Sequence, residues 1–344
     1  MTGWLASVAA LVLGLSAASA QDLKPVRIGT TATLGAGATF IALEKGYFRE
    51  AGIDAQIELT DTSGDILTML ATNQLQMAEG GLALSYFNAL KKGFPITIVL
   101  DRVSTPIHHR FLIRPELKGV VKQIGDLRGR VVAINAPSSI NVYETGKVLA
   151  HAGLTLDDVQ IKYLPFGEQA VALRNGVIDA TILIPPLADI LAEKGIATRW
   201  LDIDEQIDPR PFHIAVNFIN TDWAKQNPKL AQGAVKAIIR GVREYCQAYH
   251  GGSNREEVVK ILLKHSMVSE RALLEKYPWS ARTPDGSINS ASVIDIQDWF
   301  RKRGMISTRY AAENLVDLSF ARKAVEELGP FALENQQSQL PGCR

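Results

Sequence analysis

The chain has 344 residues, of which 47% are apolar, and its 37 basic and 36 acidic residues leave a formal net charge of +1. Such a chain can bury a sizeable core, but its balanced charge provides no broad electric field to attract nucleic acid or an anionic membrane. We therefore expect neither of these partners.

The first 20 residues have the pattern of an export signal. The apolar run from Leu5 to Leu15 is too short to span a bilayer, and Ala18-Ser19-Ala20 supplies the small residues that a signal peptidase requires. We predict cleavage after Ala20 and a periplasmic mature chain of about 324 residues, which is long enough for two lobes. Residues 1–4 contain no Lys or Arg, so a start codon elsewhere stays open.

Strands and helices alternate from residue 26 to about residue 219. The first set of strands is expected at Val26–Ile28, Ala55–Leu59 and Ile96–Leu100, with helices near Ala38–Lys45, Asp65–Thr72 and Ala83–Lys91. The second set is expected at Val131–Ile134, Val159–Tyr163 and Ala180–Ile184, with helices near Ile140–His151, Glu168–Asn175 and Leu187–Lys194. The two sets form a degenerate internal repeat. From Asp222 the pattern is helical, with helices near Ala231–His250, Arg255–Lys264, Ala291–Arg303 and Val316–Glu327.

Four short sequence segments along these units match motifs of one known protein family, in the same order. They lie at Ala42–Asp54 (ALEKGYFREAGID), Leu70–Ala78 (LATNQLQMA), Asp126–Arg130 (DLRGR) and Ala172–Ala180 (ALRNGVIDA). Together they resemble the nitrate/sulfonate/taurine family of solute-binding proteins of bacterial ABC importers, which also includes binders of thiamine precursors. The resemblance covers about residues 26–262.

This resemblance implies an α/β fold of two lobes, the type II periplasmic-binding-protein fold, with a double crossover hinge and a helical C-terminal extension. We place lobe I at residues 21–114 and 218–332 and lobe II at residues 115–217, with crossovers near His109–Arg114 and Ile214–Asn217. Residues 333–344 are polar and are expected to form a flexible tail. Cys246 lies in a helical segment and Cys343 in this tail, so whether they pair stays open.

No catalytic or metal-binding constellation is found in the sequence. The chain has six His and two Cys, with no His-Glu-x-x-His, Cys-x-x-Cys, Gly-x-Ser-x-Gly or phosphate-loop Lys motif. The family also resembles the yeast-type pyrimidine synthases, whose clustered cysteines bind iron, and a chain with only Cys246 and Cys343 lacks that motif. We therefore predict neither an enzyme nor a metal or cofactor.

Ligand contacts are expected from the loops at the carboxyl ends of the strands, where open α/β sheets bind small molecules. In the first loop, Thr31, Thr33, Leu34 and Gly35 offer hydroxyls and backbone N–H groups close to a helix N-terminus. The alternative is a helix cap by Thr39 and a plain loop.

Further candidates in the first lobe come directly after the segment Leu70–Ala78. Glu79, Gly80 and Gly81 occupy the place where the family resembled has small hydroxyl residues. Glu79 either accepts hydrogen bonds from ligand N–H groups, pairs with Arg102, or is a solvated rim carboxylate. Arg102 and His108 are alternatives for holding a carboxylate or sulfonate, because Arg presents a planar fork suited to both.

In the second lobe, Ser138 and Ser139 align with the family's hydroxyl-bearing position, and Asn141 follows on the predicted helix. An ordinary Ser cap is the alternative, and the two roles are compatible. Ile184 and Pro185 replace an aromatic residue and an acid that are common in the family, which disfavours a cationic ligand. His213 and Asn217 on the return crossover complete the predicted site.

We conclude that the chain has the features of a monomeric periplasmic binding protein that delivers a small organic solute to ABC permease and ATPase subunits. An anion, either a sulfonate or a carboxylate, is favoured over taurine. A binder of pyrimidines or related vitamin precursors and a periplasmic sensor subunit are the alternatives, and an enzyme ranks third.

Overall fold

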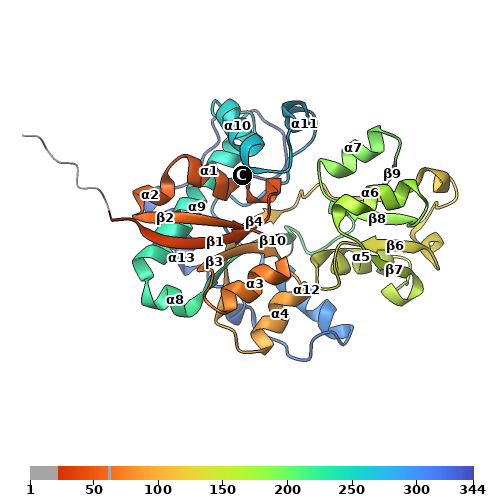
Figure 1. Cartoon of the computed structure of the whole chain (residues 1–344), viewed down its shortest axis with the longest axis horizontal. Coiled ribbons are helices and arrows are strands. Elements are labelled where there is room, and N and C mark those ends of the chain that lie inside the picture. Colours follow the sequence, from red (N-terminus) through yellow and green to blue (C-terminus); the bar gives the residue numbers. More distant parts are fainter. Residues whose placement is uncertain (1–21, 61–62) are drawn as a thin grey trace, which may run out of the picture.

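The computed structural model describes residues 22–60 and 63–344, and the predicted export signal lies outside these residues. They form two sheets, each with helices of its own, that lie side by side along the long axis of the molecule (Figure 1). Within this described part, no helix is both long and apolar enough to cross a membrane.

The first lobe contains a five-stranded sheet in the order β2-β1-β3-β10-β4. Its strands are β1 (Lys24–Thr30), β2 (Ile53–Leu59), β3 (Met77–Gly81), β4 (Ile96–Ser104) and β10 (His213–Asn220). β1 pairs in parallel with β2 and β3, whereas β10 is antiparallel to both β3 and β4. The helices are α1 (Gly37–Glu44), α2 (Tyr47–Glu50), α3 (Ser63–Ala71), α4 (Leu84–Lys91), α8 (Thr221–Gln226), α9 (Pro228–Tyr249), α10 (Arg255–His265), α11 (Arg271–Lys276), α12 (Ser290–Lys302) and α13 (Ser319–Leu328).

The second lobe repeats this plan with a sheet in the order β7-β6-β8-β5-β9. Its strands are β5 (Arg110–Ile113), β6 (Val131–Ile134), β7 (Gln160–Tyr163), β8 (Ala180–Leu183) and β9 (Thr198–Asp202), and its helices are α5 (Ile140–Ala150), α6 (Phe166–Arg174) and α7 (Leu187–Glu193). β6 lies between two parallel partners, as β1 does in the first lobe. The predicted internal repeat is thus visible in the topology.

The chain crosses between the lobes twice, at residues 105–109 and 203–212. The sequence had placed the crossings at 109–114 and 214–217, but β5 belongs to the second sheet and β10 to the first. The reason is that both segments are short apolar runs that pair antiparallel to their neighbours, and periodicity alone does not reveal which sheet a strand joins.

Helix α12 joins the hydrophobic cores of the two lobes. Phe300 lies 6.2 Å from the ring of Phe87 on α4 and 6.5 Å from the ring of Tyr143 on α5. Gly146 permits a close approach of α5 to α12, because a Cβ there would lie 2.0 Å from Trp299 Cζ2. One continuous apolar cluster therefore extends across the side of the molecule on which α5 and α12 meet.

The prediction of a flexible tail at residues 333–344 is wrong. The side chain of Cys343 is buried, the hydroxyl of Tyr249 donates to the carbonyl of Pro341 at 2.9 Å, and Nε2 of His250 lies 3.0 Å from the carbonyl of Gly342. Polar composition suggested disorder, but the backbone carbonyls of this segment find donors on α9 and at its end.

Candidate ligand-binding site

The predicted site residues come from both lobes and from the first crossing between them. Ten belong to the first lobe, namely Thr31, Thr33, Leu34, Gly35, Glu79, Gly80, Gly81, Arg102, His213 and Asn217, whereas Ser138, Ser139, Asn141, Ile184 and Pro185 belong to the second and His108 to the first crossing. A Cβ on Gly81 would lie 3.2 Å from Cγ2 of Ile140, the first residue of α5. The end of β3 therefore meets the N-terminus of α5 from the other lobe.

Glu79 is the centre of a buried polar cluster. Its carboxylate accepts hydrogen bonds from Thr30 Oγ1 at 2.7 Å and from the hydroxyl of Thr39 on α1. Nε of Arg102 lies 3.6 Å from Glu79 Oε2, and the two residues are only 6% and 1% exposed, respectively. Of the three interpretations offered by the sequence, the structure excludes the solvated rim carboxylate and supports the pair with Arg102.

Arg102 also holds the loop that follows β1. Its Nη2 donates to Thr31 Oγ1 at 3.1 Å and to Thr33 Oγ1 at 3.3 Å, and these two oxygens lie 3.2 Å apart. Because both hydroxyls accept hydrogen bonds from the guanidinium, their own hydrogens are available as donors. One hydroxyl can donate to the neighbouring Thr, and the other can donate to a ligand. Both threonines are half-buried, so this donor lies at the surface of the cluster.

The guanidinium of Arg102 is incompletely satisfied. Among the described residues Nε has no hydrogen-bond partner, since its distance from Glu79 exceeds hydrogen-bonding range. Burial lowers the pKa of Arg102, the charge of Glu79 opposes this effect, and the nearby charge of Arg282 adds to it. A buried cation in this position favours an additional acceptor nearby.

Arg282 is a member of this region that the sequence did not reveal. It is 1% exposed, it stacks 3.6 Å above the ring of Tyr245 on α9, and it donates to the carbonyls of Gly35 and Leu34 at 3.3 and 3.4 Å. It thereby fixes the same loop from the C-terminal part of the chain. Nothing in its local sequence, an irregular loop after α11, marks it as a partner of residues so far away.

His213 lies fully inside the first lobe. Its Nδ1 is 2.8 Å from Asp101 Oδ1, and its Nε2 accepts from the backbone N–H of Asn289 at 2.8 Å. Since a backbone N–H only donates, Nε2 must be the acceptor, and the proton of the neutral ring lies on Nδ1 toward Asp101. The side chain joins β10, β4 and the N-cap of α12, so both of its nitrogens already have partners within the protein.

Asn217 brings a second unpaired polar atom close to Glu79. It stands opposite Glu79 in the pairing of β10 with β3, and opposite residues of an antiparallel pair share one face of the sheet. Its Nδ2 donates to the carbonyl of Asp101 at 3.3 Å, while Oδ1 has no partner among the described residues.

In the second lobe, Ser139 occupies the N-cap position of α5 without capping it. Its hydroxyl donates backward to the carbonyl of Ala136 at 2.9 Å. Asn141 is buried and donates to Glu144, whose other oxygen lies 2.9 Å from Nδ1 of His109 on the first crossing. Glu144 and His109 thus attach α5 to the crossing, a role that the sequence did not suggest.

His108 lies on the same crossing with a positive φ of 59°. The backbone N–H groups of Ile107 and His108 donate to the carboxylate of Asp204 at 2.7 and 2.9 Å. Burial lowers the pKa of His108, which favours the neutral ring. Because Asp204 belongs to the second crossing, the two crossings are held together here.

The remaining predicted residues of the second lobe are Ile184 and Pro185, which follow β8. Ile184 is half-buried and Pro185 is buried.

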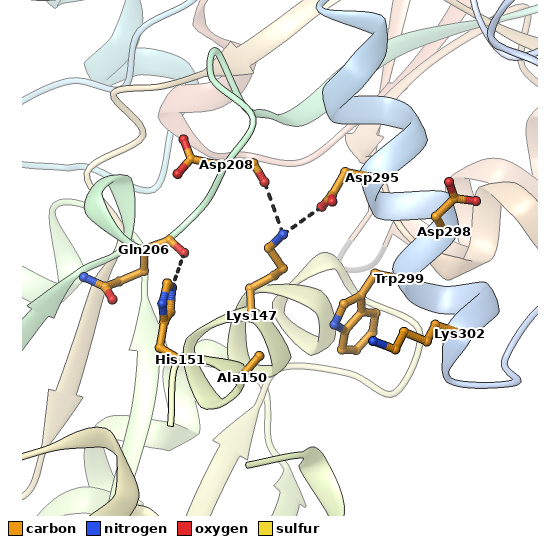
Figure 2. A pocket seen from close by; sticks show the side chains of 9 residues that line it. All are labelled: Lys147, Ala150, His151, Gln206, Asp208, Asp295, Asp298, Trp299 and Lys302. Carbon is orange, nitrogen blue, oxygen red and sulfur yellow. Dashed lines mark hydrogen bonds and ion pairs between the residues drawn. The ribbon is translucent and has the colours of Figure 1, made fainter. Parts of the chain in front are cut away.

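A cavity of about 460 Å³ lies elsewhere, where α5, the second crossing and α12 meet (Figure 2). Lys147 bridges this seam by donating to Asp295 Oδ2 at 2.9 Å and to the carbonyl of Asp208 at 3.2 Å. None of the predicted site residues lines this cavity, so we do not assign the ligand to it. The described residues contain no group of three or more His, Cys, Asp or Glu suited to a metal ion.

Comparisons with known proteins agree with this arrangement. The model of the family described as NMT1/THI5 like matches residues 36–248. The 4-amino-5-hydroxymethyl-2-methylpyrimidine phosphate synthase THI5 of Saccharomyces cerevisiae is 24% identical over 211 residues, which are 58% of this chain and 60% of the yeast protein. The chain thus spans less than two thirds of the length of the curated relatives it matches.

Solved structures share the fold at low identity. The alkanesulfonate-binding protein SsuA from Xanthomonas axonopodis pv. citri bound to MOPS has a TM-score of 0.67 and 18% identity, over 85% of this chain and 98% of that chain. The periplasmic nitrate-binding protein NrtA from Synechocystis PCC 6803 has a TM-score of 0.69 and 14% identity, over 94% and 92%. These similarities confirm the predicted two-lobe fold of periplasmic binding proteins.

Proposed function

Because the chain belongs to the NMT1/THI5-like family, we propose that it is the substrate-binding component of an ABC importer and captures a small organic anion between its lobes. The ligand class is a sulfonate or a carboxylate. One observation carries this proposal: among the described residues Nε of the buried Arg102 has no hydrogen-bond partner, and one of the hydroxyls of Thr31 and Thr33, which follow β1, is left to donate to a ligand.

The N-terminus of α5 supports the same ligand class from the other lobe. Ser139 uses its hydroxyl for the carbonyl of Ala136, which leaves the cap position without a side-chain acceptor. Free N–H groups at a helix N-terminus favour a negative charge. The end of β3 faces this point at Gly81, so an anion there would contact both lobes.

A pyrimidine or related vitamin precursor is the second candidate, and the yeast relative is the observation that favours it. A ring that is recognised through its N–H groups needs an acceptor, and Asn217 Oδ1 has no hydrogen-bond partner among the described residues. Glu79 is less suited to this role, because Thr30, Thr39 and Arg102 surround its carboxylate.

A ligand screen tests the proposal. We expect calorimetry with the full chain to find micromolar binding, about −8 kcal/mol, for at least one alkanesulfonate or carboxylate, with weaker or no binding of pyrimidines. The ligand should be recovered unchanged after prolonged incubation, whereas a mass-shifted product would identify an enzyme. Binding of pyrimidines alone would contradict the anion assignment.

Export, partners and assembly belong to the same proposal. We infer a periplasmic monomer that hands its ligand to a permease driven by an ATPase, rather than a sensor subunit. Deleting the gene should abolish uptake of the radiolabelled ligand while leaving ligand-dependent transcription unchanged. Light scattering should give the mass of one chain, and the N-terminus of the exported protein should begin at Gln21.

A further inference from the structure

The C-terminal segment from residue 330 onward is folded onto the end of α9. Nε2 of Gln247 donates to the carbonyl of Ala332 at 2.7 Å, and Nδ2 of Asn335 donates to the carbonyl of His250 at 2.8 Å. Nδ1 of His250 lies 2.7 Å from the hydroxyl of Ser338. The segment thus runs along one helix end until it reaches Cys343.

Cys343 arrives beside Cys246, and these are the two cysteines of the chain. Both side chains belong to one apolar cluster, at 0% exposure for Cys246 and 2% for Cys343. Cys246 Sγ lies 4.0 Å from the carbonyl oxygen of Arg282. A Cβ on Gly342, the residue before Cys343, would lie 2.4 Å from the Cβ of Ala281. Cys246 and the residue that precedes Cys343 therefore pack against the same segment, 281–282, and both cysteines are buried free thiols in the structure.

We propose that Cys246 and Cys343 form a disulfide that fastens the C-terminal segment to α9. The two thiols release two protons and pass two electrons to a disulfide donor, which becomes a dithiol, while a bond forms between the two sulfur atoms. The cross-link goes beyond the transport role, and it would place a covalent anchor beside the first crossing, because a Cβ on Gly342 would also lie 2.9 Å from Pro106.

The surroundings also indicate when the bond forms. Burial and the neighbouring thiol raise the pKa of Cys246, and the thiolate is the reactive form. Reaction in the folded, reduced protein is therefore slow and requires release of the C-terminal segment. Oxidation during folding avoids this obstacle, because both thiols are then exposed to the donor.

The test uses the full chain refolded with glutathione disulfide as the oxidant. We expect an intact mass about 2 Da below that of the reduced chain, and no thiol that reacts with maleimide in denaturant. Proteolysis without reductant should release one peptide pair that contains both cysteines. Two alkylatable thiols after refolding, or mixed disulfides with glutathione on each cysteine, would overturn the proposal.

A stability measurement gives a second readout, with Cys343→Ser as the matched control. Reducing the wild-type protein should lower its Tm by about 4–10 °C, because the bond closes a long loop. The same reductant should leave the Tm of Cys343→Ser unchanged. An equal response of the two proteins would also overturn the proposal, since the variant has no second thiol to bond.

Discussion

Arg102 and Glu79 are both removed from water, and a buried ion pair stabilises a protein only when further hydrogen bonds satisfy its atoms. Four threonines of the first lobe supply such bonds, namely Thr30, Thr31, Thr33 and Thr39. The arrangement positions the binding loop, and it leaves Arg102 Nε for a further acceptor. We therefore interpret the pair as the support of the anion site in the first lobe.

The first prediction compares Arg102→Lys with Glu79→Gln. Lysine keeps the charge but loses the planar fork that reaches Thr31 and Thr33, so the Kd of the anion should rise at least tenfold. Glu79→Gln should change the Kd by less than threefold, because it removes no donor to the anion. A pyrimidine ligand would use Asn217 Oδ1 as its acceptor, so neither variant should then raise the Kd tenfold. Calorimetry decides between the two, provided that circular dichroism confirms folding of both variants.

A second prediction concerns the cap of α5. Replacing both Ser138 and Ser139 by Ala should weaken binding of an anion by about 1–3 kcal/mol, the scale of lost hydrogen bonds to charge. The free energy of unfolding should fall by less than about 1 kcal/mol, because Ser139 does not cap the helix with its hydroxyl. Unchanged affinity in this double variant would remove the serines from the site.

At the scale of elements, the sequence predicted the strands and helices that carry their own periodicity. β1, β4, β6 and β8 lie close to their predicted positions, and so do the helices α1, α5 and α7 that follow β1, β6 and β8. It did not place β5 and β10 in the correct sheets, because antiparallel pairing with strands that are distant in the sequence leaves no local mark. Arg282 was missed for the same reason, since its contacts with Leu34 and Gly35 depend on the folded chain.

The docked C-terminal segment gives a pH-dependent prediction. Burial lowers the pKa of His250 from its usual 6.5, and the charge of Arg344 adds to this effect, while the bond to Gly342 opposes it. A lowered pKa in the folded state means that the unfolded state binds the proton more tightly. The contribution of His250 to stability is therefore present above pH 6.5 and is lost as the pH falls through its folded-state pKa.

Hydrogen exchange of residues 338–344 measures this effect in the reduced protein. Protection should decrease as the pH falls below about 6.5, after correction for the intrinsic exchange rate. In His250→Gln the segment should keep a constant protection over the same range, because an amide does not titrate there. Equal pH profiles in the two proteins would exclude His250 as the cause.

At the scale of the whole molecule, the two lobes are connected by two crossings and by α12, and they also meet at the opposite rim. Asp204 holds both crossings together, and the aromatic contacts of Phe300 extend the core from one lobe into the other. At the rim, Lys276 Nζ on α11 lies 2.7 Å from Glu193 Oε2 on α7. Since α7 belongs to the second lobe, this ion pair is made only when the lobes are close together.

Ligand binding should therefore make the molecule more compact. A binding protein that closes about its crossings shifts toward the closed population when ligand contacts both lobes. Small-angle scattering at saturating ligand should show a smaller radius of gyration with an unchanged mass. A constant radius, with binding verified by calorimetry in the same buffer, would count against closure.

The last prediction assigns part of the free energy of lobe closure to the ion pair between Lys276 and Glu193. Lys276→Glu places two carboxylates where the lobes meet, which disfavours the closed form and should raise the Kd of the ligand about two- to fivefold at low salt. Lys260→Glu is the matched control, because Lys260 is also exposed and pairs with Glu256 within α10 of the same lobe. Its Kd should stay at the wild-type value. Since salt screens exposed charges, the difference between the variants should shrink at 1 M ionic strength. A salt-independent difference would point to a packing effect of residue 276 instead of an electrostatic one.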